Sequence, residues 1–559
     1  MKKILLVIAL GVVSLYSSAK TPPTQKDAEK QHQLEVAQNI ESLLYVFRSI
    51  NLFYVDTVSP SKLMQSAARS MFRSLDPYSE YISKEEMEDF EFSTTGKYGG
   101  VGSLIRQRGE WVEIAEPYKG SPSDLSGLKA GDRLVSIDNE TLQSIGSAAV
   151  SNKLKGDPGT TFQLVYRPLR DTTTLDTVMI TREKISIPAV PYYGIIRDSI
   201  GYINFSSFTK DGATEVHAAF NAMKQSAEMN SLILDLRDNG GGVVDEAIEI
   251  LSLFLPKNSE VLSIIGKIEE SNKDFSTIYS PEDLDIPIVV LVNNMSASAS
   301  EIVAGALQDL DRAVIIGERS FGKGLVQTTR AAPYGGMVKI TTGKYYTPSG
   351  RCIQALDYTH RQEDGSVGHI PDSLIQEFTT VNGRKVYSGG GIIPDIKVEL
   401  ESYSNFTKLM VFYSFIDDFA NLWAAHNSPS KEEFELSDEL YQEFVDFMQD
   451  KEIKYESYSA IKLKELRDAA AEEKYDSLII QELDLIAQKI SNDKNQELQR
   501  NKTDIKEMLK YALLNRLFYK EYAIEKSTEV DPYINAAVEV LSNPSEYQRI
   551  LTEQDTQKN

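Results

Sequence analysis

Cysteine and histidine, the two side chains that most often carry catalytic or metal chemistry, are scarce in this sequence. Its 559 residues include one cysteine and five histidines. Cys352 has no partner for an intrachain disulfide and lies in no local signature of a cysteine nucleophile, so we interpret it as a packing residue. None of the histidines belongs to a triad-like motif, and neither H-E-x-x-H nor a spaced Cys/His ligand set occurs. The sequence therefore argues against a cysteine nucleophile, a conventional Ser/His/Asp triad and a zinc enzyme, and we expect no metal and no other cofactor.

Positive charge is also scarce. The chain has 59 Lys and Arg against 82 Asp and Glu, which gives a formal net charge of -23. A field of that sign repels phosphate backbones, so nucleic acid is not an expected partner. Apolar residues make up 41% and charged residues 25%, the balance of a globular chain with a buried core. Because 559 residues exceed one ordinary core, we expect several domains.

The one long apolar run is at the N-terminus. Lys2 and Lys3 precede an apolar stretch from Ile4 to Tyr16, and small residues follow up to Ala19. This order is typical of a secretory signal peptide, and no later stretch approaches the roughly 20 apolar residues that a membrane helix needs. We expect residues 1–19 to be removed near Ala19 and the protein to be exported to the periplasm. An uncleaved segment that keeps the protein at the membrane is the alternative.

The residue pattern changes three times along the rest of the chain. Residues 20–95 have apolar side chains at helical spacing, and residues 96–183 contain short strands and turns. Strands alternate with helices over residues 184–400, and residues 401–559 are acidic and helical. These changes predict an α/β multidomain protein, with an N-terminal helical segment, an inserted mostly-β module, an α/β core and a C-terminal helical extension.

A cluster of small residues, Asn293–Glu301, follows the apolar run Ile286–Val292, which we predict to be a buried strand, and precedes a helical pattern. A serine at such a turn, here Ser298, is exposed and lies beside N–H groups that the first helical turn leaves unpaired. These groups can stabilise an oxyanion. Ser298 and Glu301 also fit a Ser-x-x-Glu capping box, which would stabilise the helix without any chemistry. Both interpretations stay open at this point.

Lys323 lies between two glycines, which leave its side chain without steric cover, and Gln327 follows shortly after it. A lysine can replace histidine as general base if burial lowers its pKa toward neutrality, because a protonated amine cannot accept a proton. If residues 325–329 form a strand, alternation places Lys323 and Gln327 on one face, where the amide can orient the amine. The alternative is a surface glycine turn with a solvated lysine.

Together, the serine motif, Lys323 and Gln327 resemble the carboxyl-terminal processing peptidases. Other motifs of that family are present as Leu236–Gly242, Tyr346–Arg351 and Gly391–Asp395. The resemblance covers roughly residues 74 to 399 and implies a crotonase/ClpP-like α/β peptidase core. It also implies residue roles: the nucleophile Ser298, the base Lys323 and the positioning amide Gln327. The implied oxyanion hole comprises the N–H of Ala299 and that of one glycine in 240–242, among which we favour Gly241.

Two further stretches, Tyr98–Ser103 and Ser121–Asp138, resemble a PDZ domain. A glycine-rich loop can direct several N–H groups at a terminal carboxylate, while the following strand edge accepts the peptide as an added strand. We expect Gly100, Val101 and Gly102 to bind the carboxylate. A glycine-rich hairpin without a ligand is the alternative.

The resemblance implies an exported serine endopeptidase that captures free C-termini of proteins or peptides and cleaves C-terminal regions of envelope proteins through an acyl-enzyme. A catalytically silent PDZ adaptor of the envelope and an acyl-transfer or hydrolase activity on small molecules are the alternatives. Residues 401–559 lie outside the resemblance, so we expect the helical segments to serve homo-oligomer formation or adaptor docking. Truncation after Glu401 is then expected to spare cleavage of a short peptide. The polar segment 356–389 has no assigned role.

Overall fold

The computed structural model describes most of the chain. The described residues are 25–225, 228–361, 366–399, 402–453, 455, 457–475, 477–489 and 494–552. The expected signal peptide, residues 1–19, lies outside them. The structure divides into two compact units, Met1–Tyr81 and Ile82–Asn559.

Over its described residues, 25–81, the first unit contains two helices, α1 (Gln25–Phe53) and α2 (Pro60–Arg73). The helix α2 begins at Pro60. Proline is favoured at the first helical position because its backbone angle suits a helix and its missing N–H would have no partner there. Ser59 precedes it and accepts a hydrogen bond from the N–H of Lys62. The helical segment expected at the N-terminus is therefore present.

The first α-helix of the second unit is α3 (Met87–Thr95), and a mostly-β module follows it. Its main sheet has the antiparallel order β3-β4-β5-β7-β8, and β2 pairs with β9 beside it. The strands and helices are β2 (Lys97–Gly100), β3 (Ser103–Arg108), β4 (Trp111–Pro117), α4 (Pro122–Leu125), β5 (Arg133–Ile137), β6 (Glu140–Thr141), α5 (Ser147–Leu154), β7 (Thr161–Arg167), β8 (Asp176–Thr181) and β9 (Glu183–Ser186). Alternate side chains of β7, such as Phe162 and Leu164, are buried in a core of its own.

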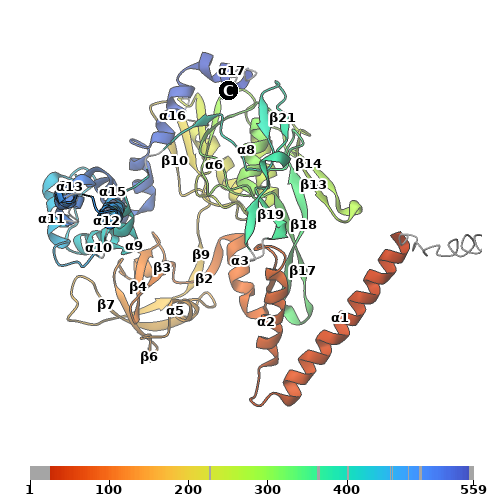
Figure 1. Ribbon diagram of the computed structural model, residues 1–559, viewed down its shortest axis with the longest axis horizontal. Coiled ribbons are helices and arrows are strands. Elements are labelled where there is room, and N and C mark those ends of the chain that lie inside the picture. The colour runs from red at the N-terminus through yellow and green to blue at the C-terminus, as the bar shows by residue number, and fades with distance from the viewer. Residues whose placement is uncertain are drawn as a thin grey trace, which may run out of the picture. The chain divides into compact units, whose positions relative to one another are not determined.

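A six-stranded sheet, ordered β10-β11-β12-β15-β16-β23, forms the α/β core (Figure 1). It is parallel from β11 onward, and β10 pairs antiparallel with β11. Its strands are β10 (Tyr192–Ile196), β11 (Ile200–Asn204), β12 (Ser231–Asp235), β15 (Ile288–Val292), β16 (Val314–Gly317) and β23 (Ile396–Lys397). Every residue of β12 and of β15 is buried, as expected for strands covered on both faces.

Three helices pack against one face of this sheet, namely α6 (Gly212–Lys224), α7 (Val244–Phe254) and α8 (Ala299–Asp309). A second antiparallel sheet, ordered β14-β13-β18-β17, accompanies them. Its strands are β13 (Glu260–Gly266), β14 (Lys273–Ser276), β17 (Leu325–Ala331) and β18 (Met337–Tyr346). The polar segment 356–389 contains two small hairpins, β19 (Leu356–Arg361) with β20 (Val367–His369), and β21 (Glu377–Thr379) with β22 (Lys385–Tyr387).

The other face of the core sheet is covered by the last two helices, α16 (Pro532–Leu541) and α17 (Pro544–Thr552), drawn in blue beside β10 in Figure 1. Ile534 and Leu551 of these helices are buried against the strands, and the Tyr547 hydroxyl donates to the carbonyl of Ile288 at 3.1 Å. The expectation that truncation after Glu401 spares cleavage of a short peptide stays a prediction, but it does not account for the packing of these two helices on the core sheet.

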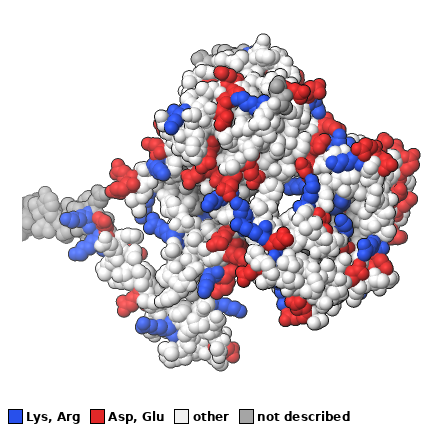
Figure 2. Space-filling model, turned by 180° about the vertical axis from the view of Figure 1, so that it is seen from behind, with Lys and Arg blue, Asp and Glu red and all other residues white. Residues whose placement is uncertain are grey.

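The rest of the C-terminal extension is a helical bundle with its own apolar core. Its helices are α9 (Asn405–Phe412), α10 (Phe415–His426), α11 (Asp438–Phe447), α12 (Tyr458–Glu472), α13 (Ser477–Lys489), α14 (Lys494–Arg500) and α15 (Lys502–Ser527). On the face of the whole molecule seen in Figure 2, acidic and basic side chains are interspersed. Among the residues that the structure describes, no helix is both long and apolar enough to cross a membrane.

Candidate active site and peptide-binding groove

Ser298 lies immediately before α8, in the turn that follows β15. Its backbone has φ 58° and ψ −112°, a region that residues other than glycine rarely adopt. Such strain persists only where the surroundings impose it, and it is concentrated at functional sites. Here the surroundings include the Tyr345 hydroxyl, which donates to the Ser298 carbonyl at 3.2 Å. Ser298 is half-buried between the buried Ala297 and Ala299, so its side chain lies where the surface is accessible.

A single buried carboxylate connects the Ser298 turn with the Lys323 segment. Glu301, in the first turn of α8, has no exposed surface and accepts from the N–H of Ser298 at 2.8 Å and from the N–H of Lys323 at 2.9 Å. It also accepts from the N–H of Gly322 at 2.7 Å and from the hydroxyl of Ser320 at 2.5 Å. Burial raises the pKa of the Glu301 carboxyl, and these hydrogen bonds oppose that rise.

Only part of the hydrogen bonding of Glu301 could be predicted from the sequence. The Ser-x-x-Glu pattern predicts that Glu301 caps the helix at Ser298, and the hydrogen bond to the Ser298 N–H agrees with it. The other partners, Ser320, Gly322 and Lys323, are 19 to 22 residues away in the sequence. No local pattern records such contacts, so the role of Glu301 between the two segments could not be predicted.

Lys323 is half-buried in an irregular segment that precedes β17. Gly322 before it has φ +86°, and a Cβ there would come within 2.4 Å of the Cβ of Ala355, so only glycine fits. Gln327 lies on β17 and donates to the Thr341 hydroxyl of β18 at 3.1 Å. The strand expected over 325–329 is present.

Alternation along a strand does not place Lys323 and Gln327 on one face, because that reasoning needs both residues in the same strand. It assumed one unbroken strand between them. In the structure, β17 begins at Leu325, and its register against β18 shifts between Val326 and Gln327. A bulge of this kind changes which face a side chain occupies. A common face for the two side chains therefore does not follow from their spacing.

Gly241 packs directly against the Ser298 turn. Its φ is +93°, and a Cβ would lie 2.8 Å from the Cβ of Ser298 and 2.8 Å from the nitrogen of Ala299. The Gly241 N–H donates to the Asn239 side chain at 2.9 Å in this conformation. The N–H of Ala299 is in the first turn of α8, where helices provide no intrahelical acceptor. The backbone groups expected to form the oxyanion hole are thus adjacent, and the choice of Gly241 stays a prediction.

Gly100 is the last residue of β2, and Val101 and Gly102 join this strand to β3 in the mostly-β module. Gly102 has φ +73°, and its carbonyl accepts from the hydroxyls of Ser121 and Ser123, each at 2.7 Å. These bonds hold the loop at the mouth of a groove of about 350 Å³ between β3 and α5. The apolar lining of this groove includes Val101, Ile105, Ala148 and Leu154. A groove of this form suits an extended peptide with an apolar last side chain.

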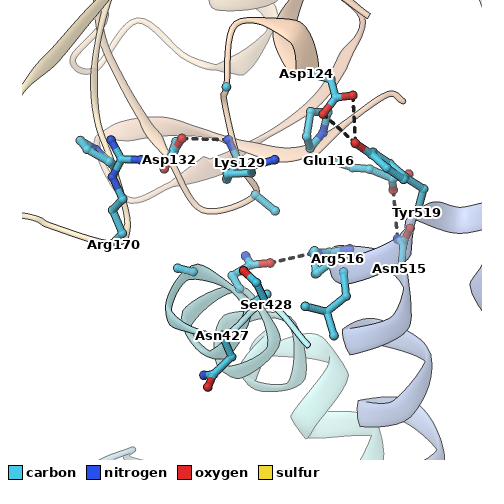
Figure 3. Close-up of a pocket in the computed structure, with 18 of the residues that line it drawn as sticks. Glu116, Asp124, Lys129, Asp132, Arg170, Asn427, Ser428, Asn515, Arg516 and Tyr519 are labelled. Carbon is cyan, nitrogen blue, oxygen red and sulfur yellow. Dashed lines mark hydrogen bonds between the residues drawn. The ribbon is translucent and has the colours of Figure 1, made fainter. Parts of the chain in front are cut away.

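The groove strand β3 is also held by the helical bundle. Asp418 of α10 pairs with Arg106 of β3 at 3.0 Å and with Arg108. Nearby, a cleft of about 300 Å³ lies between the module and the helices α10 and α15 (Figure 3). Across it, the Tyr519 hydroxyl donates to Asp124 at 3.0 Å, as the dashed lines in Figure 3 show. The bundle therefore positions the peptide groove through ion pairs and hydrogen bonds.

The sequence matches three family profiles in the same order as these structural parts. They are "PDZ domain" at residues 113–168, "Peptidase family S41" at 199–362 and "Probable PDZ-protease, C-terminal helical domain" at 406–541. The three matches correspond to the groove module, the α/β core and the helical extension.

Curated relatives carry matching names. The carboxy-terminal-processing protease of Bartonella bacilliformis is 35% identical over 317 residues, which is 56% of this chain and 72% of that protein. A "Probable CtpA-like serine protease" of Staphylococcus haemolyticus is 30% identical over 408 residues, 71% of this chain and 79% of that protein. A solved structure named "photosystem II D1 C-terminal processing protease" is 24% identical and covers 64% of this chain and 92% of that one, with a TM-score of 0.34.

The two curated relatives establish the family, because each is at least 30% identical and is matched over more than two thirds of its length, 72% and 79%. The resemblance seen in the sequence is therefore confirmed. The fold class is confirmed as well, with an α/β peptidase core, an inserted PDZ domain and helical segments at both ends. The chain belongs to peptidase family S41 and is a carboxy-terminal-processing serine peptidase with a PDZ domain.

Proposed function

We propose that this peptidase works through Ser298 and Lys323. The Ser298 hydroxyl attacks the scissile carbonyl while the neutral amine of Lys323 takes its proton, and the resulting ammonium protonates the leaving amine. Water then hydrolyses the acyl-enzyme, with the Lys323 amine as base. One observation carries this proposal: the buried Glu301 carboxylate accepts from the N–H groups of both Ser298 and Lys323, which ties the two segments together.

The charge that develops on the substrate oxygen needs hydrogen-bond donors. We assign this role to the N–H of Ala299 and to one glycine in 240–242. The Gly241 N–H now donates to the side chain of Asn239. To act in the oxyanion hole, it must break that hydrogen bond and donate to the oxyanion instead. Gln327 is assigned to the positioning of Lys323, with its own amide held by Thr341 at 3.1 Å.

Substrates are proteins or peptides with a free C-terminus. The loop Gly100–Val101–Gly102 binds the terminal carboxylate, and the free edge of β3 pairs with the preceding residues. We place the enzyme in the periplasm because of the signal-like residues 1–19, with C-terminal regions of envelope proteins as its substrates. The helical segments serve homo-oligomer formation or adaptor docking.

Comparative proteomics of the envelope tests this assignment of substrate and place. Cells with wild-type enzyme are compared with cells that produce Ser298→Ala, and C-terminal peptides are quantified. We expect envelope proteins with extended C-termini to accumulate in the variant. An unchanged envelope, with the changes confined to cytoplasmic proteins, would refute the proposed location.

Glu301→Gln is expected to lower kcat about a hundredfold, because small misplacements of reacting groups have costs of that order. A glutamine keeps the volume but replaces one acceptor oxygen by an amide NH₂, which faces N–H groups that need an acceptor. The measurement is kcat on a short peptide, together with the unfolding midpoint. Retention of wild-type kcat in a folded variant would show that Glu301 does not hold the two segments in register.

Amidation of a substrate's C-terminus is expected to raise KM roughly tenfold or more and to change kcat little. Charge-assisted hydrogen bonds contribute about 1.5–3 kcal/mol each before desolvation, and the amide has no charge. The catalytic groups are in another part of the chain. The control is Gly102→Val, in which the Cβ would meet the Cβ of Ser121 at 2.4 Å and crowd the loop. Equal kcat/KM for acid and amide over a range of salt concentrations would rule out carboxylate capture.

A further inference from the structure

The loop that contains Gly241, residues 236–242, has an irregular backbone. It connects β12 to α7, and its φ is positive at Asp238 (58°) and at Gly241 (93°). A backbone of this kind takes its position from specific contacts, because the repeating hydrogen bonds of a helix or strand do not continue through it. The contacts of this loop therefore decide where the N–H of Gly241 lies relative to Ser298.

One set of contacts joins this loop to the nucleophile turn, residues 293–298. The N–H of Asp238 donates to the side-chain oxygen of Asn293 at 3.0 Å, and the Asn293 amide donates back to the Asp238 carboxylate at 2.9 Å. The N–H of Ala297 donates to the carbonyl of Asn239 at 3.1 Å. The loop and the turn are thereby held side by side, as the two donors of an oxyanion hole require.

A second attachment starts from Arg237 and leads to the C-terminal extension. The side chain of Arg237 is largely buried, with 16% of its surface exposed, and its guanidinium pairs with Asp531 at 2.8 Å. It also pairs with Asp235 at 2.6 Å and lies over the ring of Tyr533, 4.8 Å from the centroid. A largely buried charge that loses a partner is strongly disfavoured. The two carboxylates and the ring therefore fix Arg237, and with it the start of the loop.

Asp531 is itself held rigidly. It is the N-cap of α16, where its carboxylate accepts from the N–H groups of Tyr533 at 2.8 Å and Ile534 at 3.1 Å. Tyr533 and Ile534 are buried against the core sheet, which fixes the first turn of α16 on that sheet. A side chain that its own helix has already ordered loses little further freedom when it binds a partner. The Asp531 carboxylate is thus a fixed anchor for Arg237.

We propose that Asp531 is a positioning residue of this peptidase, which through Arg237 fixes the loop that presents the Gly241 N–H to the oxyanion. Asp531 lies outside the residues that match the peptidase profile, 199–362, so the helical extension contributes to catalysis as well as to folding. The inference rests on the nucleophile and the oxyanion hole proposed above. Without the Asp531 charge, Arg237 is left with Asp235, and the loop relaxes into a position that misaligns the donor N–H.

Two substitutions at Asp531 separate its charge from its role as a helix cap. Asp531→Asn keeps a preferred N-cap residue but removes the charge that pairs with Arg237. Asp531→Glu keeps the charge but has a side chain that is not among the preferred N-caps. The control is Arg197→Ala, because Arg197 holds the same segment to the core through the carbonyls of Thr528 at 3.2 Å and Glu529 at 2.8 Å. All three variants are made in the full chain.

The measurements are kcat and KM on a short peptide, the thermal unfolding midpoint, and the Kd of a peptide aldehyde by calorimetry. In the aldehyde adduct the Ser298 oxygen bonds to the aldehyde carbon, the hydroxyl proton passes to the Lys323 amine, and the former carbonyl oxygen becomes an oxyanion. No leaving group departs from this adduct. The affinity for the aldehyde therefore reports on the donors of the oxyanion hole.

Asp531→Asn is expected to lower kcat about tenfold and to weaken aldehyde binding by about the same factor, because both depend on the alignment of the donor N–H groups. KM and the unfolding midpoint should change little. Asp531→Glu should be less stable than the parent and yet lose less kcat than Asp531→Asn. Arg197→Ala should lower the midpoint and leave kcat near that of the parent.

A purely structural role predicts a different order of activities. If kcat falls in step with the unfolding midpoint, so that Asp531→Glu loses more activity than Asp531→Asn, Asp531 does not position the loop. An unchanged kcat in Asp531→Asn, or a lowered kcat with unchanged aldehyde affinity, also refutes the inference. Equal aldehyde affinity in the parent and in Ser298→Ala would instead refute the nucleophile on which the inference rests.

Discussion

Ser298→Ala and Lys323→Ala are each expected to abolish peptide cleavage, with losses of about 10⁴-fold or more in kcat, as is found for members of one catalytic unit. Stability should change little, because Ser298 is half-buried at a turn and Lys323 precedes a strand. The measurements are kcat on a short peptide and the thermal unfolding midpoint of each variant. The double variant should lose no more activity than either single one, since the two groups act in the same step.

Two controls separate the catalytic pair from other groups of the same type. Lys344→Ala removes an exposed lysine from β18 and should keep most of the activity. Replacement of any one of the five histidines should also leave an active enzyme. Near wild-type turnover in Lys323→Ala would show that the base has been misassigned. A specific loss of kcat on removal of one histidine would revive a triad.

Removal of residues 530–559 is expected to prevent folding of the peptidase core, although these residues contain none of the family's catalytic motifs. The truncation deletes α16 and α17 and exposes one face of the core sheet to water. The side chains lost from that face are Tyr533, Ile534, Ala537, Val540, Tyr547 and Leu551. Burial of one large apolar side chain contributes about 1.5–3 kcal/mol, whereas a whole domain is stable by only about 5–15 kcal/mol.

The same truncation removes a charge partner from a central motif. Arg237, in the Leu236–Gly242 stretch, is paired with Asp235 and with Asp531 at 2.8 Å, and it stacks on Tyr533 with 4.8 Å to the ring centroid. The loss of one partner leaves a largely buried guanidinium less well compensated. Solubility and circular dichroism of the purified chain provide the measurement, with removal of residues 553–559 alone as the control. A soluble truncated chain that unfolds cooperatively and cleaves a short peptide would contradict the role of these helices.

The central part of the fold could be predicted because its signals are local. The continuous apolar run Ile286–Val292 predicts a strand buried on both faces, and the structure has β15 there, with every residue buried. The small residues after it predict a turn into a helix, and α8 begins at Ala299. The position of Ser298 at a strand-to-helix turn follows from these two patterns alone.

What escaped prediction depends on contacts between distant residues. The helical periodicity of the C-terminal extension predicts amphipathic helices, but it does not say which surface they cover, so the packing of α16 and α17 on the core sheet was missed. Glu301 was interpreted through its neighbour Ser298, while its other partners belong to a later segment. Tyr98 belongs to the glycine-rich stretch Tyr98–Ser103, and only the folded loop brings its ring to the groove.

Trapping of the acyl-enzyme tests the central claim most directly. The full chain is mixed with an activated ester that acylates serine peptidases, and the adduct is located by mass spectrometry of the peptide that contains residues 293–301. We predict a stoichiometric adduct on Ser298 in the wild type, slow or no labelling in Lys323→Ala, and no labelling of this peptide in Ser298→Ala. An adduct on another residue, or equal labelling rates in the wild type and Lys323→Ala, would contradict the Ser298 and Lys323 assignment.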